Sequence, residues 1–396
     1  MSAHDVVITG IGLVSSLGEG TDAHWQKLTA ANPAPVVDTE RYPPYAIHPL
    51  PEIDWSLQIA KRGDQRQMET WQRLGTYAAG LALDDAGIKA DEALCATMDM
   101  VVAAGGGERD EAVDSDILAA SENRNDHDVL LNEKLTTELR PTLFLAQLSN
   151  LLAGNISIVH KVTGSSRTFM GEEGAGVSAV ETAAARIRSG QSSHMLVGGA
   201  FQTEHPDMLL GYELGGYLHR GPWKPVWQRD GADGGGVVSG SGAAFLVLES
   251  REHAQKRGHH AYAQLGPVIS GRARRSRENL ADAISSLLDR TALPDGPLLA
   301  ISGASGAHAA TAAEKSALRR HEGLAVRGFG TLTGHLKEAQ FPFAVALAAL
   351  AIDRKAGLPP FDAMAEKPFA GAPRSVLATA IGYHYFEGMA LIGALD

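Results

Sequence analysis

Short apolar runs rich in β-branched residues alternate along this chain with longer, alanine-rich segments of helical period. Strands are expected at 5–15, 98–107 and 194–201, and helices at 70–88 and 142–160. Such alternation predicts a sheet whose faces are covered by helices, because an amphipathic helix needs an apolar surface against which to pack. The expected fold class is therefore α/β.

The second part of the chain repeats this theme. Strand-and-turn patterns recur at 261–271, 296–306 and 326–336, a helical pattern follows at 341–352, and two apolar strand patterns close the chain at 375–395. We therefore expect two related α/β halves, 1–255 and 256–396, that share one core. The strongly polar segment 108–138 is expected to form a surface insertion with short helices.

The charge of the chain argues against one class of partner. With 35 basic and 46 acidic residues, the formal net charge is −11. A nucleic-acid binder needs a basic face to neutralise phosphates, so no nucleic acid is expected as a partner. The basic run at 271–277 is a local exception, which a solvated loop or a contact with an acidic partner would explain.

The chain has a single cysteine, Cys95, which excludes intramolecular disulfides and a multi-cysteine metal site. We expect Cys95 at the entry to a strand, as a small buried hydrophobic residue, and we expect no metal. No apolar run approaches the roughly 20 residues of a membrane-spanning helix, and no signal-peptide pattern precedes the first strand. The expected location is cytoplasmic, with no membrane span.

Two glutamates, Glu172 and Glu173, stand where an alanine-rich helix begins, after a turn of small residues. Acidic groups are favoured at helix N-termini by about 0.3–1 kcal/mol, so compensation of the helix dipole is one explanation. That explanation leaves open why both carboxylates precede a helix that otherwise has the composition of a buried one. The neighbouring motifs offer a second explanation.

Four segments, taken together and in order, resemble the β-ketoacyl-ACP synthases of the thiolase fold. They are VVITGIGLVSSLG at 6–18, the helix and loop at 141–166, the segment KPVWQRDGADGGGVVSGSGAAFLVLE at 224–249, and TLTGHL at 331–336. The resemblance implies a five-layered α–β–α–β–α duplication that forms a dimer. It also implies decarboxylative condensation on an acyl carrier protein, which brings its own phosphopantetheine, and no other cofactor.

Residues of the family's catalytic motifs are altered in this chain. Counting back from Gly176, the position of the family's nucleophilic cysteine falls on Glu173, and a glutamate cannot hold an acyl chain as a thioester. The position of the first catalytic histidine falls on Gly303 or Ala304, and His308 is a nearby substitute.

The resemblance assigns the second catalytic histidine to His335, and the family's lysine becomes Gly330. Taken alone, His335 could instead cap the helix that follows Gly334. The C-terminal loop differs as well, because Gly382, Tyr383, His384, Tyr385 and Phe386 stand where the family has a glycine-rich sequence. Its aromatic side chains could plug the active-site pocket or could be ordinary packing.

Three functions follow as hypotheses. The chain is a catalytically incomplete subunit that pairs with an active ketosynthase and shapes the acyl tunnel, as chain-length factors do. Alternatively it is an active 3-oxoacyl-ACP synthase or a malonyl-ACP decarboxylase, although Glu173 would repel a malonyl carboxylate unless burial raised its pKa. Thirdly, it is a non-catalytic homodimer that binds an acyl group or its carrier. The pathway would be fatty-acid synthesis, with very long chains as one option, or polyketide synthesis.

Overall fold

The structure is a computed structural model that describes residues 4–141, 143 and 147–395. One large sheet runs through it in the strand order β12-β11-β13-β14-β10-β1-β9-β7-β5-β6. The first half of the chain contributes β1 (Val6–Ser15), β5 (Asp99–Ala104), β6 (Ser166–Met170), β7 (His194–Phe201) and β9 (Gly242–Ser250). The second half contributes β10 (Ala263–Gly271), β11 (Leu298–Ser302), β12 (Leu324–Gly328), β13 (Ser375–Ile381) and β14 (Glu387–Gly393).

The two halves have the same topology. Starting from the central pair β1 and β10, the order is 1-9-7-5-6 on one side and 10-14-13-11-12 on the other. In both halves the first strand neighbours the fifth, followed by the fourth, second and third. The expected α/β duplication is therefore confirmed. The expected boundary at 255/256 falls inside α11 (Arg251–Arg257) and stays a prediction.

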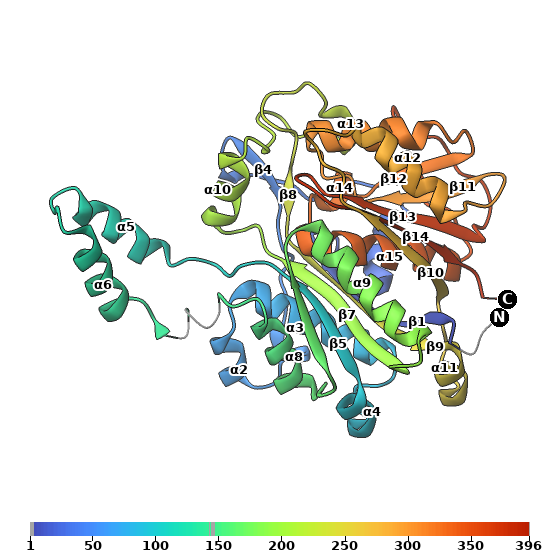
Figure 1. Cartoon of the computed structure of the whole chain (residues 1–396), viewed down its shortest axis with the longest axis horizontal. Helices are drawn as coiled ribbons and strands as arrows, with labels where there is room; N and C mark the ends of the chain where they lie inside the picture. The colour runs from blue at the N-terminus through green and yellow to red at the C-terminus, as the bar shows by residue number, and fades with distance from the viewer. Residues whose placement is uncertain (1–3, 142, 144–146, 396) are drawn as a thin grey trace.

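Helices cover the sheet in layers (Figure 1). The helices α9 (Glu173–Arg188) and α15 (Gln340–Asp353) contact each other and strands of both halves, so they form the central layer. The helix α3 (Thr70–Asp85) packs on β1 and β9, while α12 (Leu280–Thr291) packs on β10, β14 and α13 (His308–Arg319). Buried residues run without a break from Gln340 to Ile352, as expected for a helix that is apolar on all sides.

Shorter elements complete the chain. The helices are α1 (Gly20–Leu28), α2 (Arg62–Gln67), α4 (Glu92–Thr97), α5 (Glu111–Ser121), α6 (His127–Thr137), α8 (Leu151–His160), α10 (Pro206–Leu214) and α14 (Gly330–Thr333), and β2 (Gly18–Glu19) pairs with β1. A small separate sheet joins β3 (Asp38–Tyr42), β4 (Tyr45–His48) and β8 (Ser239–Gly240). Figure 1 shows α5 and α6 standing away from the body of the molecule, so the surface insertion at 108–138 is confirmed.

Two expectations about local structure need correction. Cys95 is buried as expected, but it lies within α4 rather than at a strand entry, because Asp91 caps that helix through its side chain and the strand β5 begins only at Asp99. Of the helix expected at 142–160, the structure describes α8 from Leu151 to His160, and residues 142 and 144–146 lie outside the described residues.

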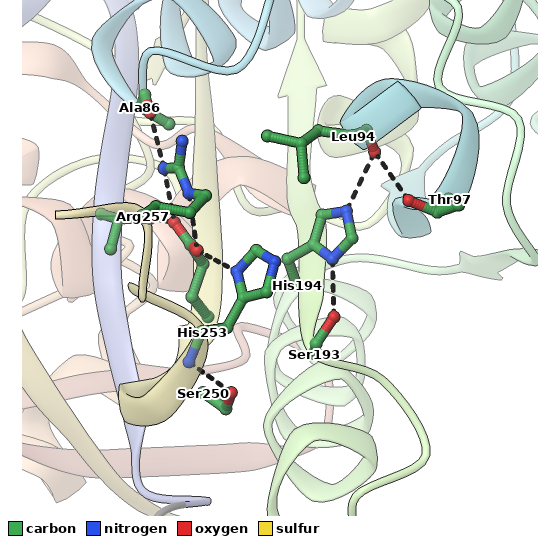
Figure 2. Close-up of polar contacts among 10 residues, drawn as sticks. Ala86, Leu94, Thr97, Ser193, His194, Ser250, His253 and Arg257 are labelled. Carbon is green, nitrogen blue, oxygen red and sulfur yellow. Dashed lines mark hydrogen bonds and ion pairs between the residues drawn. The ribbon is translucent and has the colours of Figure 1, made fainter. Parts of the chain in front are cut away.

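A polar cluster fastens α11 to the first half of the sheet (Figure 2). The ring of His194 on β7 stacks on the ring of His253, with centroids 4.7 Å apart and planes 4° from parallel. Nε2 of His194 donates to the carbonyl oxygen of Leu94 at 2.9 Å, and Nδ1 of His253 donates to the carboxylate of Glu249. Arg257 also binds Glu249, at 2.9 Å, so the buried carboxylate is paired.

Candidate functional site

The predicted site residue Glu173 is the first residue of the central helix α9, and its side chain is 1% exposed. Its Oε1 accepts hydrogen bonds from Nε2 of His335 at 2.7 Å and from the backbone N–H of Tyr383 at 3.2 Å. The helix N-terminus favours negative charge at this position. The structure therefore brings together two predicted site residues and the C-terminal loop.

His335 is held on both of its ring nitrogens. Nδ1 lies 2.7 Å from the hydroxyl of Tyr212, which comes from α10. A neutral imidazole satisfies both contacts when Tyr212 donates to Nδ1 and the Nε2 hydrogen is donated to Glu173. Burial, followed by the nearby Tyr383 and Glu173, raises the pKa of Tyr212 well above its ordinary value, so its hydroxyl stays a donor. Both ring nitrogens thus bind other side chains, and the helix α15 that follows has no side-chain cap, so the capping alternative for His335 is wrong.

The C-terminal loop covers this pair through Tyr383. Its hydroxyl donates to the carboxylate of Glu172, and its ring lies 5.6 Å from the ring of His335 and 5.4 Å from that of Tyr212. Burial and the hydrogen bond to Glu172 both raise the pKa of Tyr383. Tyr383 therefore packs directly over the catalytic histidine that the family resemblance assigned.

The left-handed backbone conformation in this loop falls on Phe386, with φ of 76°. The Phe386 ring sits against Gly174 in the first turn of α9, where an added Cβ would lie 2.8 Å from Cγ of the ring. Gly174 thus leaves room for the phenylalanine to close on the helix. His384 is exposed; its ring contacts those of its two neighbours, and its backbone carbonyl oxygen accepts from Nε of Arg275 at 3.4 Å.

The basic run at 271–277 supports the loop instead of being only a solvated segment. Nη2 of Arg275 donates to the carbonyl oxygen of Gly382 at 3.0 Å and pairs with Glu387 at 2.8 Å. The guanidinium of Arg272 lies over the ring of Tyr385, 5.0 Å from its centroid. These contacts fix the loop at both of its ends.

The contacts of His308 are with a different part of the chain from the Glu173–His335 pair. It begins α13, its backbone N–H donates to the carbonyl oxygen of Gly235 at 3.1 Å, and its ring sits beside Gly236. Within the part of the chain that the structure describes, no hydrogen bond joins His308 to Glu173 or His335. Its role as a substitute for the first catalytic histidine stays a prediction.

The two altered positions on the second half are buried and lie close to each other. Gly303 follows β11, and its carbonyl oxygen accepts from Nε2 of Gln340 at 3.1 Å. Gly330 begins α14, and a Cβ there would lie 2.8 Å from the carbonyl oxygen of Ala304. A lysine side chain at position 330 would therefore require this loop to shift.

Sequence reasoning did not single out two further residues of the site, Tyr212 and Glu338. Glu338 is 3% exposed, and burial raises its pKa to about 7, with Glu172 and Glu173 adding to the rise. The Oε2 atoms of Glu172, Glu173 and Glu338 are all buried and have no hydrogen-bond partner. The charged pair Lys337–Glu338, which interrupts an otherwise apolar run after TGHL, was the signal available in the sequence.

The site can accept hydrogen bonds and exchange protons, but it offers no thiol. Cys95 is buried on α4, where its Sγ lies 3.6 Å from the carbonyl oxygen of Ile88. Across the described ranges, no group of histidine, cysteine, aspartate and glutamate side chains is suited to hold a metal ion. No helix in those ranges is long and apolar enough to cross a membrane.

Known proteins match this chain in sequence and in fold. A 3-oxoacyl-[acyl-carrier-protein] synthase 2 of Rhizobium meliloti (strain 1021) is 31% identical over 290 residues, which cover 68% of this chain and 64% of that protein. The chain therefore matches less than two thirds of that relative's length.

Two solved structures share the fold. The ishigamide ketosynthase/chain length factor superposes with a TM-score of 0.78 at 20% identity, over 99% of both chains. A type II PKS acyl-carrier protein in complex with its ketosynthase, AntDE:AntF, contains a chain that superposes with a TM-score of 0.74 at 18% identity, also over 99% of both chains. These likenesses confirm the thiolase-like fold that the sequence resemblance implied. Residues 3–254 match the N-terminal domain of β-ketoacyl synthases, so this chain belongs to the β-ketoacyl synthase family.

Proposed function

We propose that this chain is a catalytically incomplete ketosynthase-type subunit, which binds an acyl carrier protein and shapes the acyl site of an active ketosynthase with which it forms a dimer. The pathway is fatty-acid or polyketide synthesis, in the cytoplasm. No resident cofactor is needed, since the carrier protein brings the phosphopantetheine arm. The observation that carries the proposal is the hydrogen-bonded pair of Glu173 and His335 at the start of α9.

This pair argues against condensation. In the family a thiolate at the helix N-terminus attacks an acyl thioester, and a carboxylate at that position cannot form the same stable intermediate. Glu173 also occupies Nε2 of His335 at 2.7 Å, so this nitrogen already has a hydrogen-bond partner. Each group is therefore hydrogen-bonded to the other and is not free to bind a ligand through these atoms.

The loop adds a steric argument. Tyr383 covers His335, and Phe386 closes on Gly174, so the aromatic side chains support the plugged-pocket interpretation over ordinary packing. The ketosynthase/chain length factor and the carrier-protein complex share this fold, which makes a partner role and a carrier protein reasonable expectations for this chain.

The test of catalysis is intact mass spectrometry of the carrier protein. The purified chain is incubated with malonyl-ACP and a long acyl-ACP, and we expect the carrier species to remain unchanged. Formation of acetyl-ACP would indicate a decarboxylase, and formation of an extended 3-oxoacyl-ACP would indicate an active synthase. Either product, if lost in His335→Ala, would overturn the proposal.

The test of the partner role is co-expression with active ketosynthases from the same genome. We expect the two chains to co-purify in equal amounts and to separate as a heterodimer on size-exclusion chromatography. A chain that stays a homodimer, and still binds acyl-ACP in a thermal-shift assay, would instead support the non-catalytic binding hypothesis.

A further inference from the structure

A small cavity adjoins the candidate site on the side of Glu338. Its volume is about 50 Å³, enough for a few water molecules or one small organic group. It lies between the ends of β5 and β7 and the turn after His335. The lining residues are Trp71, Gly105, Gly106, Ala200, Phe201, Gln202, Met208, Lys337 and Glu338.

Three polar atoms among the lining residues are buried and have no hydrogen-bond partner. They are Nε1 of Trp71, Oε1 of Gln202 and Oε2 of Glu338, on residues that are 4%, 7% and 3% exposed. A buried polar group without a partner costs about 1–3 kcal/mol, so three around one cavity are expensive unless something binds there. The three atoms comprise one donor and two acceptors.

The backbone is arranged to present Glu338 and its neighbour. Lys337 adopts a left-handed backbone conformation, with φ of 42°, which residues other than glycine rarely adopt. Its ammonium lies 4.7 Å from the ring centroid of Tyr212 and 5.2 Å from that of Phe201. Gly105 leaves room for the carboxyl, since a Cβ there would lie 2.7 Å from Oε1 of Glu338.

We propose that this cavity binds a small neutral group that carries both a C=O acceptor and N–H donors, of which a primary carboxamide is the simplest. The carbonyl oxygen accepts from Nε1 of Trp71, and the two N–H groups donate to Oε1 of Gln202 and Oε2 of Glu338. Each of the three unpartnered atoms is satisfied by one such ligand.

Other ligand classes fit less well. An alkyl group would leave all three polar atoms unpaired. An anion would be repelled by the carboxylate of Glu338. The charges of Glu172 and Glu173, which already raise the pKa of Glu338, would add to that repulsion. A cation would leave the Trp71 donor unsatisfied and would lie near the ammonium of Lys337. The identity of the natural ligand rests on the proposed function. If the chain binds an acyl carrier protein, the ligand is the polar end of the acyl group that the carrier brings.

The test uses three molecules of nearly equal shape: acetamide, acetone and acetate. The readout is the indole N–H resonance of Trp71 in ¹⁵N-labelled full-length protein, assigned by its loss in Trp71→Phe. We expect a saturable shift with acetamide and at least about fivefold weaker binding of acetone, because acetone lacks both donors. Acetate should bind more weakly still.

Variants locate the binding. Gln202→Met and Glu338→Met should each weaken acetamide binding by about fivefold or more and reduce its preference over acetone, whereas Glu314→Gln, a buried glutamate outside the cavity, should leave both unchanged. Gln202→Met alone keeps the test decisive if Glu338→Met does not fold.

Three outcomes would overturn the proposal: equal binding of acetone and acetamide, tighter binding of acetate, or no saturable shift with any of the three, which would mean that water alone fills the cavity. Titration with acyl-ACP is scored separately. Binding of acetamide without binding of acyl-ACP would support the ligand site in the cavity and contradict the proposed carrier role. Binding of acyl-ACP without binding of acetamide would support the carrier role and contradict the ligand site.

Discussion

His335 and Glu173 lie 162 positions apart in the sequence, yet Nε2 of the histidine and Oε1 of the glutamate are 2.7 Å apart in the buried centre of the molecule. The glutamate begins the central helix of the first half, and the histidine follows β12 and α14 of the second half. The contact therefore joins the two halves of the duplication at the position where the family resemblance places catalysis.

Glu173→Ala is expected to destabilise the protein by about 1–3 kcal/mol, because it leaves two buried donors, on His335 and on the backbone of Tyr383, without their acceptor. A helix-dipole role alone would cost no more than about 1 kcal/mol. Equilibrium denaturation in urea, with the free energy of unfolding extrapolated to water, measures the difference. Glu173→Gln keeps a carbonyl acceptor and should lose less. A more stable Glu173→Ala would show that burying the carboxylate costs more than its contacts contribute.

Gly174→Ala is expected to destabilise the protein by about 1–3 kcal/mol, since the new Cβ would lie 2.8 Å from Cγ of Phe386. In the Phe386→Ala background the same change should cost at least about 1 kcal/mol less, which a double-mutant cycle measures. Gly154→Ala, in α8, is the control, because its nearest neighbour is 3.7 Å away and alanine should stabilise that helix by up to about 1 kcal/mol. Independent effects of Gly174 and Phe386 would show that the loop does not close on the helix.

Much of the fold follows from the sequence. The run at 341–352 is apolar on every face, which requires a fully buried helix, and α15, in the central layer of the structure, is buried from Gln340 to Ile352. The alternation of strands and helices likewise predicted the two matching halves. The position of Cys95 was harder to predict, because a side-chain cap from Asp91 starts a short helix in a segment whose apolar residues suit a strand.

The site could be predicted only where a motif marks it. Glu173 and His335 stand in recognisable surroundings, and their contact confirms that the two motifs meet. Tyr212 is on α10, in a segment without a motif, and reaches His335 only through the tertiary fold. Glu338 is two residues past the TLTGHL motif, and no periodicity of the sequence indicates its burial or the cavity beside it.

Stability is expected to fall in mild acid through His194. Burial lowers the pKa of His194 from its ordinary 6.5. The hydrogen bond to the carbonyl oxygen of Leu94 opposes this shift, as does the charge of Glu249, while His253 and Arg257 add to it. The unfolded chain then binds the proton more readily than the native protein, so this contribution is complete above about pH 6.5 and is lost as the pH falls below it. His194→Phe should reduce the slope of unfolding free energy between about pH 5 and 7. The control is His127→Phe, in the exposed surface insertion at 108–138, which should leave the slope unchanged. An unchanged slope in His194→Phe would show that His194 does not cause the loss of stability in acid.

Glu173→Cys is expected not to restore condensation, although the helix N-terminus would lower the pKa of the new thiol. The reaction also needs a first histidine, and the positions that correspond to it hold Gly303 and Ala304. Tyr383 would still cover His335, and Phe386 would still close on Gly174. Intact mass spectrometry of the carrier protein, after incubation with malonyl-ACP and a long acyl-ACP, should therefore detect no 3-oxoacyl species. Extension by Glu173→Cys that disappears in Glu173→Cys/His335→Ala would show that one substitution had inactivated an otherwise complete site.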